Sequence, residues 1–433
     1  MIDVQPVKGT RDFYPEDMRL RNWLFGIWRD TARAFGFEEY DACVLESEEL
    51  YVRKAGDEIT GQLYNFEDKG GRRIALRPEM TPSLARLILQ RQRALTFPIK
   101  WFSIPQCFRY ERMTRGRKRE HFQWNVDVVG LPGLEAEVEV LSILLTAMGG
   151  MGLTAEHVVV HLNDRRLLNA VLDHLGVPEA AHLPVMVVMD KRDKISAAQL
   201  AEQLQAQGLT PEQVQGLEQI LALRGLDAVA GVIGARAEVA DLRRLMGLLD
   251  KVGFGAYVDF DITVVRGLSY YTGTVFEVRD RGASLRAICG GGRYDSLLSA
   301  FGGETVPAIG FGFGDVVILE LLADLALLPR LTRAVDDVVI PFSAAEMEMA
   351  LELSQALRRQ GRSVHTDLSG RKLKRMLQHA DEVGAARAVL LMPDELARDE
   401  VVLREMASRS EQRVSLRALL SGGAGAQLSD GGE

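Results

Sequence analysis

FRYERMTRGRKREHFQWNVD, residues 108–127, holds two strand-forming segments on either side of a basic loop. Because side chains alternate between the two faces of a strand, Arg109 and Glu111 are expected on one face of the first strand. The second strand alternates between polar and apolar residues throughout. A sheet built on it would have one dry face and one face carrying charges, amides and an imidazole, which predicts an active-site floor. The polar face carries His121, Gln123, Asn125 and Asp127, and the apolar face carries Phe122, Trp124, Val126 and Val128.

The loop between the two strands, residues 113–118, is too long for a tight hairpin and carries Arg115, Arg117 and Lys118. Such a cluster suits contact with a polyphosphate or with the end of a nucleic acid. A basic cluster taken alone is more often a solvated charged loop. The polar strand face beside it favours a binding site.

The bulk properties indicate a large globular protein. The chain has 433 residues, of which 47% are hydrophobic, enough for two or more domains. No apolar run approaches the roughly 18–20 residues needed to span a bilayer, and residues 1–11 lack a signal region, so we expect a cytoplasmic protein without a membrane partner. The net charge of −8 argues against nucleic-acid binding overall, but phosphate contacts depend on local clusters. Neither a disulfide framework nor a zinc site is expected from the scattered Cys43, Cys107 and Cys289.

The pattern of elements divides the chain at a linker near Pro329 and Arg330. Residues 156–252 have helical periodicity, which predicts a mainly helical insertion interrupted by one strand over 184–189. Before the linker, helices are expected from Pro15 to Gly36, over 82–92 and over 306–328, and strands over 63–66, 73–76, 256–278 and 285–289, with two long strands across 99–129.

Beyond the linker, residues 335–420 alternate strands and helices, which predicts an α/β unit with a mostly parallel sheet. Residues 421–433 are mainly Gly, Ala, Ser and Asp and have little to bury, so we expect a disordered tail.

F-R-Y-E, the basic loop and Q-W-N-V-D resemble motif 2 of the class II aminoacyl-tRNA synthetases in its histidine-specific form. The resemblance to the histidyl-tRNA synthetase family extends over nearly the whole chain, residues 8–420. It implies an α+β catalytic domain (1–330) built on an antiparallel sheet, the helical insertion, and an α/β anticodon-binding domain. It also implies that Arg109 holds the α-phosphate of ATP and the amino-acid carboxylate. Glu111 would meet the adenine side, and Arg117 and Arg119 the outer phosphates.

Two further segments resemble the family's amino-acid site. LRPEMT, residues 76–81, is similar to the loop that receives the substrate ammonium, which implies that Glu79, Met80 and Thr81 bind histidine, although Thr81 is equally suited to cap the following helix. VRGLSYYTGTVFE, residues 265–277, resembles the histidine-specific motif. It implies that Arg266 is the second catalytic arginine, across the α-phosphate from Arg109.

The same resemblance implies how the substrate side chain is recognised. Tyr270 and Tyr271 would line the imidazole pocket, with the Tyr271 hydroxyl and the Asp127 carboxylate engaging the two ring nitrogens. Gln123 would help to orient the amino acid. Taken without the resemblance, the two tyrosines could simply be strand aromatics in a core.

CGGGRYD (289–295) and PAIGFGFGDVVILELL (307–322) match motif 3 in order but depart from it in content. The usual motif 3 arginine falls at Val317, and the aromatic residue that normally lies on adenine falls at His121. We therefore expect His121 to stack on adenine, and Arg117 or Arg119 to meet the γ-phosphate. Cys43 and Ser269 are smaller departures from the usual sequence pattern of the family.

The resemblance implies that histidine and ATP give histidyl-adenylate and pyrophosphate, with Mg²⁺ bridging the outer phosphates, before transfer to the 3′ end of histidine tRNA. It also implies a homodimer whose interface includes the first helix and the strand near Cys43. Two alternatives stay open: the histidine-sensing regulatory subunit of ATP phosphoribosyltransferase, and a class II synthetase for another amino acid. The helix expected from residue 371 begins with a basic cluster. Such a cluster is usually a solvated face, but in an anticodon-binding domain it would contact tRNA through Arg371, Lys372, Lys374 and Arg375.

Overall fold

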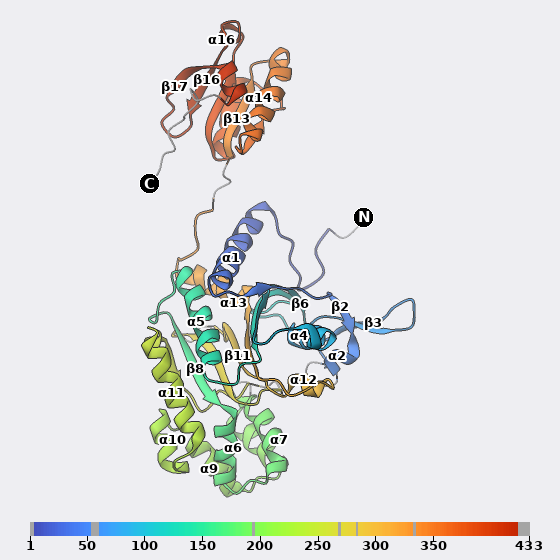
Figure 1. Cartoon of the computed structure of the whole chain (residues 1–433), viewed down its shortest axis with the longest axis vertical. Helices are drawn as coiled ribbons and strands as arrows, with labels where there is room; N and C mark the ends of the chain where they lie inside the picture. Colours follow the sequence, from blue (N-terminus) through green and yellow to red (C-terminus); the bar gives the residue numbers. More distant parts are fainter. Residues whose placement is uncertain are drawn as a thin grey trace. The chain divides into compact units, whose positions relative to one another are not determined.

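The computed structural model describes residues 4–52, 60–192, 195–266, 270–282, 285–331 and 335–422. The chain divides into two units, Met1–Pro329 and Arg330–Glu433 (Figure 1). Each unit has a sheet and a core of its own. No helix in the described ranges is long and apolar enough to cross a membrane.

A nine-stranded sheet forms the centre of the first unit. Neighbouring strands run antiparallel except at the two edges, where β1 pairs with β5 and β8 with β9 in parallel. The ten-residue β7 lies between β5 and β12, with the short β6 paired to it as well. The expected antiparallel catalytic sheet is therefore confirmed. The strand order is β1 (Glu38–Glu39), β5 (Ile99–Ser103), β7 (Glu120–Val129), β12 (Ala308–Gly314), β11 (Cys289–Arg293), β10 (Thr274–Asp280), β8 (Val158–Asp164) and β9 (Val258–Phe260), and β6 spans Gln106–Phe108.

The apolar face of β7 packs against helices α1 (Pro15–Ala34) and α5 (Glu135–Gly150). The indole of Trp124 in β7 stacks on that of Trp28 in α1, with ring centroids 5.8 Å apart and an interplanar angle of 13°. The ring of Phe313 in β12 lies against the same Trp28 ring, at a centroid distance of 5.4 Å. All three rings are fully buried, so the dry face predicted for this strand is the centre of the core.

Helix α1 begins where the sequence predicts. Proline suits its first position, because the backbone N–H that Pro15 lacks would have no partner inside the helix. The side chain of Asp17 accepts a hydrogen bond from the backbone N–H of Tyr14 at 3.1 Å and so caps the start. The buried face of the helix then places Trp28 against the sheet.

The opposite face of the central sheet is only partly covered. Helix α4 (Thr81–Arg91) packs there through Leu84 and Ile88. Because α4 covers only part of this face, the polar side of β7 is left open to a cavity. A small sheet near α4 consists of β2 (Leu45–Ser47), β4 (Arg73–Leu76) and β3 (Tyr64–Glu67), with α2 (Glu48–Val52) beside β4.

The insertion is a helical subdomain with its own apolar cluster. The strand predicted over 184–189 is wrong, because these residues lie in α7 (Glu179–Met189). A short apolar run does not by itself distinguish a buried strand from a buried helix, and Val185 and Met189 are buried in the helical core. The residues from 158 to 164 form β8 of the central sheet. The helices are α6 (Arg165–His174), α7, α8 (Ala197–Ala206), α9 (Pro211–Leu221), α10 (Leu226–Ile233) and α11 (Ala237–Lys251).

Four other predictions need correction. The helix expected over 306–328 is strand β12 followed by α13 (Asp315–Asp324), because the alternation of glycine and phenylalanine at 310–314 has the period of a strand. The strand expected over 285–289 begins only at Cys289, so the glycine run itself is β11. The strand before the basic loop ends at Phe108, which leaves Arg109 and Glu111 outside it. The strand expected over 256–278 is two strands, β9 and β10.

The second unit is an α/β domain. Its sheet has β13 parallel to β14 and β15, as expected, and two further strands, β16 and β17, are added antiparallel at one edge. From residue 423 onward, the predicted disordered tail lies outside the described residues. The strands are β13 (Val335–Pro341), β14 (Val364–Thr366), β15 (Ala385–Leu391), β16 (Glu400–Glu405) and β17 (Glu411–Ser415), and the helices are α14 (Met347–Arg359), α15 (Leu373–Glu382), α16 (Pro393–Leu396) and α17 (Leu416–Ser421).

Trp124→Ala should lower the free energy of unfolding of the first unit by about 3–5 kcal/mol, because it leaves a cavity between β7 and α1. Urea unfolding followed by tryptophan fluorescence measures this, since all four tryptophans lie in the first unit. Val7→Ala, at a side chain 70% exposed, is the control and should change stability little. Equal effects of the two changes would contradict the assignment of Trp124 to the core.

Candidate active site

A cavity of about 970 Å³ opens above the polar face of β7. Its wall comes from β7, β11 and β12, from the start of α4, from the basic loop and from the insertion. The structure brings these sequence-predicted site residues together there: Glu79, Thr81, Arg109, Glu111, Arg117, His121, Gln123, Asp127, Arg266, Tyr270 and Tyr271.

Of the residues expected to bind histidine or ATP through the family resemblance, Met80 and Arg119 do not line this cavity. The side chain of Met80 is fully buried just before α4. The guanidinium of Arg119 lies over the ring of Tyr110, 3.8 Å from its centroid, and its Nε donates to the carbonyl of Glu111 at 3.3 Å. The structure therefore places Met80 in the core and Arg119 on the outer side of the basic loop.

One end of the cavity carries two buried carboxylates. The Tyr294 hydroxyl donates a hydrogen bond to Oδ1 of Asp127, while Oδ2 of Asp127 is buried without a hydrogen-bond partner among the described residues. Burial raises the pKa of Asp127 to about 7, and the hydrogen bond from Tyr294 opposes that shift. Burial also raises the pKa of Glu79, which accepts a hydrogen bond from the Tyr270 hydroxyl at 3.2 Å. This end can therefore receive hydrogen-bond donors or a cation.

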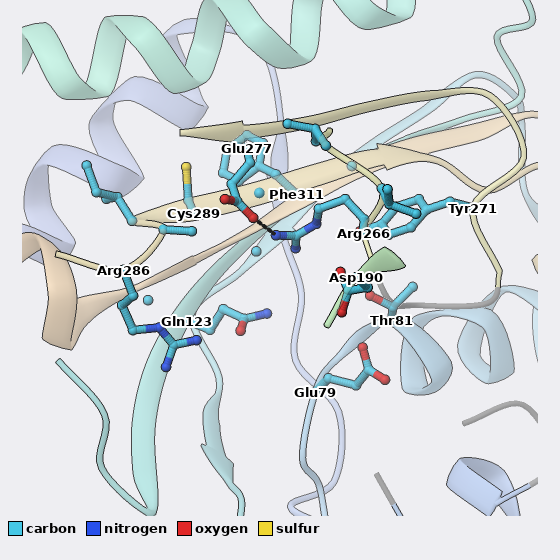
Figure 2. A pocket seen from close by; sticks show the side chains of 18 of the residues that line it. Glu79, Thr81, Gln123, Asp190, Arg266, Tyr271, Glu277, Arg286, Cys289 and Phe311 are labelled. Carbon is cyan, nitrogen blue, oxygen red and sulfur yellow. Dashed lines mark hydrogen bonds and ion pairs between the residues drawn. The ribbon is translucent and has the colours of Figure 1, made fainter. Parts of the chain in front are cut away.

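The centre of the cavity is occupied by an arginine–glutamate pair. Nη1 of Arg266 lies 3.1 Å from Oε2 of Glu277, as the dashed line in Figure 2 marks. Arg266 has a φ of 55°, a left-handed conformation that costs a non-glycine residue on the order of 1–3 kcal/mol. Such an outlier persists where the surroundings hold the residue in place, and it aims this guanidinium into the cavity.

The glycines of β11 and β12 give the polar side chains room to lie flat on the sheet. A Cβ at Gly290 would lie 2.5 Å from Nη1 of Arg266. A Cβ at Gly310 would collide with the Asp127 carboxylate, and one at Gly312 with the amide of Gln123. The glycine run, a weak signal by itself, thus accommodates the protein's own functional groups.

His121 lies farther along β7, with its Nε2 3.3 Å from Oε1 of Gln123. Burial, and then the positive charge of Arg109, lower the pKa of His121 to about 3, so its ring is neutral near pH 7. A neutral, flat ring at this place could stack on a base. The same strand thus carries a carboxylate at one end of the cavity and an aromatic ring farther along.

The basic loop divides its charges between the cavity and the outside. Arg109 lies in an irregular segment, and its Nε donates to the carbonyl of Pro78 at 2.9 Å. Nε of Arg117 pairs with the Glu111 carboxylate at 2.8 Å inside the cavity. Arg115, expected to contact a phosphate, instead forms ion pairs with Glu320 and Asp324 of α13 and does not line the cavity. Its role in the described structure is to fasten the loop to α13.

Sequence reasoning missed several lining residues. Arg286 lies in the short segment before the glycine run, where no motif marked it. Tyr294 follows the glycines and is the hydrogen-bond donor to Asp127. Glu277 and Arg279 are two residues apart in β10 and therefore lie on one face of it. This spacing could have predicted that both line the cavity. The missed cavity residues that bear polar groups include Lys191, Arg192, Arg224, Glu277, Arg279, Arg286 and Tyr294.

Asp127→Asn should change how stability depends on pH. Between the ordinary Asp pKa of 3.8 and about 7, the unfolded chain has lost the Asp127 proton while the folded chain keeps it, so rising pH destabilises the wild type. Relative to the wild type, the variant should therefore gain roughly 3 kcal/mol in unfolding free energy between pH 5 and pH 8, measured by urea unfolding. Asp30→Asn, at a side chain 78% exposed, is the control. If the unfolding free energies of Asp127→Asn and the wild type differed by the same amount at pH 5 and at pH 8, the raised pKa would be contradicted.

Comparisons with known proteins match both units. The family model described as histidyl-tRNA synthetase matches residues 9–314, and that of an anticodon binding domain matches residues 336–422. The chain is 46% identical over 419 residues to a chloroplastic/mitochondrial histidine–tRNA ligase of Arabidopsis thaliana, covering 96% of this chain and 86% of that protein. It is 41% identical over 421 residues to the histidine–tRNA ligase of Opitutus terrae, covering 96% of both.

A solved structure has the same fold. The histidyl-tRNA synthetase from Nostoc sp. PCC 7120 superimposes with a TM-score of 0.79 at 25% identity, over 97% of this chain and 99% of that one. The first family model alone matches more than half of the residues, and the second follows it in the expected order. The chain therefore belongs to the histidyl-tRNA synthetase family.

Proposed function

We propose that the protein is a histidine–tRNA ligase, which activates L-histidine with ATP and transfers it to the 3′ end of histidine tRNA. The observation that carries the proposal is the polar face of β7, where Asp127 lines the same cavity as Arg109 and Arg266 and its Oδ2 has no hydrogen-bond partner in the described part of the chain. One end of this cavity suits an amino acid and the other a nucleotide. The likeness to histidine–tRNA ligases, which extends over 96% of the chain, also favours this activity over the regulatory-subunit alternative.

Histidine would bind at the acidic end. Its ammonium would lie near Glu79 and Thr81, and an imidazole N–H would donate to Oδ2 of Asp127. The Tyr271 hydroxyl would engage the other ring nitrogen. Because a buried acceptor left without its donor costs free energy, this site would reject side chains that lack an N–H at that place, often by several powers of ten.

Activation needs little covalent work from the protein. The histidine carboxylate attacks the α-phosphorus, the bond from that phosphorus to the bridging oxygen breaks, and pyrophosphate leaves with the electron pair. Arg109 and Arg266 would neutralise the charge that grows on the α-phosphate. Gln123 would orient the amino acid, and the neutral ring of His121 would stack on adenine.

Mg²⁺ would enter with the nucleotide. In nucleotide sites this ion is bound mainly by phosphate oxygens, waters and one or two carboxylates, so it needs no cage of protein ligands. The described residues contain no group of three potential metal ligands. The cavity does offer the carboxylate of Glu111, beside Arg117. When bound, the ion would neutralise charge on the outer phosphates.

The second unit would bind the anticodon. Unpaired anticodon bases expose edges and faces that side chains read, while basic residues hold the phosphates. The start of α15 is exposed and basic. The residues proposed to contact tRNA there are Arg371, Lys372, Lys374 and Arg375.

We further propose that the active protein is a homodimer. Apolar side chains gather at α2 and the small sheet, where Phe66 is 46% exposed and Val52 43% exposed. Val44 and Leu45, next to Cys43, are exposed there as well. A second copy of the chain would bury these groups. The cytoplasmic location stays a prediction.

Purified protein should catalyse histidine-dependent exchange between ATP and pyrophosphate. Arg266→Ala should lower kcat/KM for this exchange about 100- to 1000-fold, because one fixed donor to the α-phosphate is lost. Arg243→Ala, an exposed arginine in the insertion paired with Asp227, is the control and should leave the rate unchanged. Wild-type protein that shows no exchange with histidine would refute the proposed function.

Phe66→Asp should weaken the dimer and shift the sedimentation coefficient toward that of a monomer at micromolar concentration. Phe342→Asp is a matched control, because this phenylalanine is exposed to a similar extent, 48% against 46%. Wild-type protein that sediments as a monomer, or a Phe66→Asp variant as dimeric as the wild type, would contradict the proposed interface.

A further inference from the structure

The arginines that line the cavity differ in how their charge is balanced. Arg117 pairs with Glu111 at 2.8 Å, and Arg266 pairs with Glu277 at 3.1 Å. Arg286 also lines the cavity, but in the described ranges of the chain no hydrogen bond or ion pair engages its guanidinium. Its side chain is exposed to the cavity rather than packed in the core.

The charged groups around Arg286 do not balance its positive charge. The charged groups that act on it are Arg117, Arg109, Glu111 and Glu277. Both of these carboxylates already bind other arginines, since Glu277 also pairs with Arg279 at 2.6 Å. The positive charge on this side of the cavity therefore exceeds the negative charge, and a polyanion would relieve the repulsion between the guanidinium groups.

The neighbouring helix α13 cannot offer a cation at the corresponding place. Its Val317 faces the basic loop, and a Cβ at Gly116 would lie 3.3 Å from Cγ2 of Val317. Gly116 has a φ of 73°, and Arg115 fastens the loop by its ion pairs with Glu320 and Asp324. The loop therefore takes the space into which a longer side chain at 317 would extend.

Arg286 lies on the side of the cavity where a leaving group would go. Figure 2 shows Arg286 and Gln123 on one side of the Arg266–Glu277 pair, and Tyr271 on the other. In an in-line displacement the attacking carboxylate and the departing pyrophosphate lie on opposite sides of the α-phosphorus. If histidine lies by Tyr271 and the α-phosphate by Arg266, the outer phosphates extend toward Arg286.

We propose that Arg286 binds the β- and γ-phosphates of ATP and the pyrophosphate that leaves, so that the segment before β11 carries the cation that α13 lacks at Val317. This assignment rests on the proposed ligase function. A guanidinium suits the task because its planar array of N–H donors binds two phosphate oxygens at once. Arg286 thus becomes a contact for the outer phosphates, a task that the family resemblance assigned to Arg117 and Arg119.

The test compares wild type, Arg286→Ala and Arg286→Lys, with Arg243→Ala as the control. In pyrophosphate exchange, Arg286→Ala should raise the KM values for ATP and for pyrophosphate about 10- to 100-fold, the range expected for lost charge-assisted hydrogen bonds. The KM for histidine should stay within about twofold, because histidine binds at the other end of the cavity, and Arg286→Lys should lie between the two. Unchanged KM values for ATP and pyrophosphate in Arg286→Ala would overturn the assignment.

Calorimetric titration with ATP and with AMP separates this inference from the proposed function. Wild type should bind ATP more tightly than AMP, and Arg286→Ala should lose most of that difference while its affinity for AMP is kept. This result would support the assignment even if histidine-dependent exchange failed in the wild type. A variant that prefers ATP over AMP as strongly as the wild type does would overturn it, whatever the exchange assay shows.

Discussion

The structure depends on the period-two alternation of side chains along β7, because one face of this strand packs in the core and the other lines the cavity. Its even-numbered side chains enter the core, where Trp124 stacks on Trp28 of α1 at a centroid distance of 5.8 Å. Its odd-numbered side chains, including Gln123 and Asp127, form the floor of the cavity. Because the same backbone carries both sets, the packing of the core fixes where the polar groups point. A one-residue change of register would exchange the two faces.

This arrangement constrains the neighbouring strands. Polar side chains that lie flat on a sheet need space above the adjacent backbone, and the glycines of β11 and β12 leave that space free. Gly290 lies under the guanidinium of Arg266, and Gly310 lies beside Asp127. Phe311 and Phe313 alternate with these glycines and fill the core on the other side. The charged side chains can therefore lie over β11 and β12 only because these strands have glycine at the positions beneath them.

The sequence predicted the elements whose pattern is local and periodic. The faces of β7, the start of α1 and the alternation of the first C-terminal strands and helices follow from spacing alone. Residues 184–189 were predicted wrongly, because a run of buried apolar residues has no periodicity that separates helix from strand. Arg286 was missed for another reason: nothing near it in the sequence indicates that the basic loop, with Gly116 and Arg117, lies beside it. Likewise, the sequence of the basic loop shows its positive charge, but it does not show that Arg115 forms ion pairs with α13 instead of lining the cavity.

The central claim is that the polar face of β7 receives histidine at one end and the phosphates of ATP at the other. A crystal structure of the protein with ATP and histidinol, which lacks the attacking carboxylate, tests this most directly. We expect an imidazole nitrogen within hydrogen-bond distance of Oδ2 of Asp127 and the α-phosphate between Arg109 and Arg266. An imidazole ring bound away from β7, or phosphates at the Asp127 end of the cavity, would contradict the account.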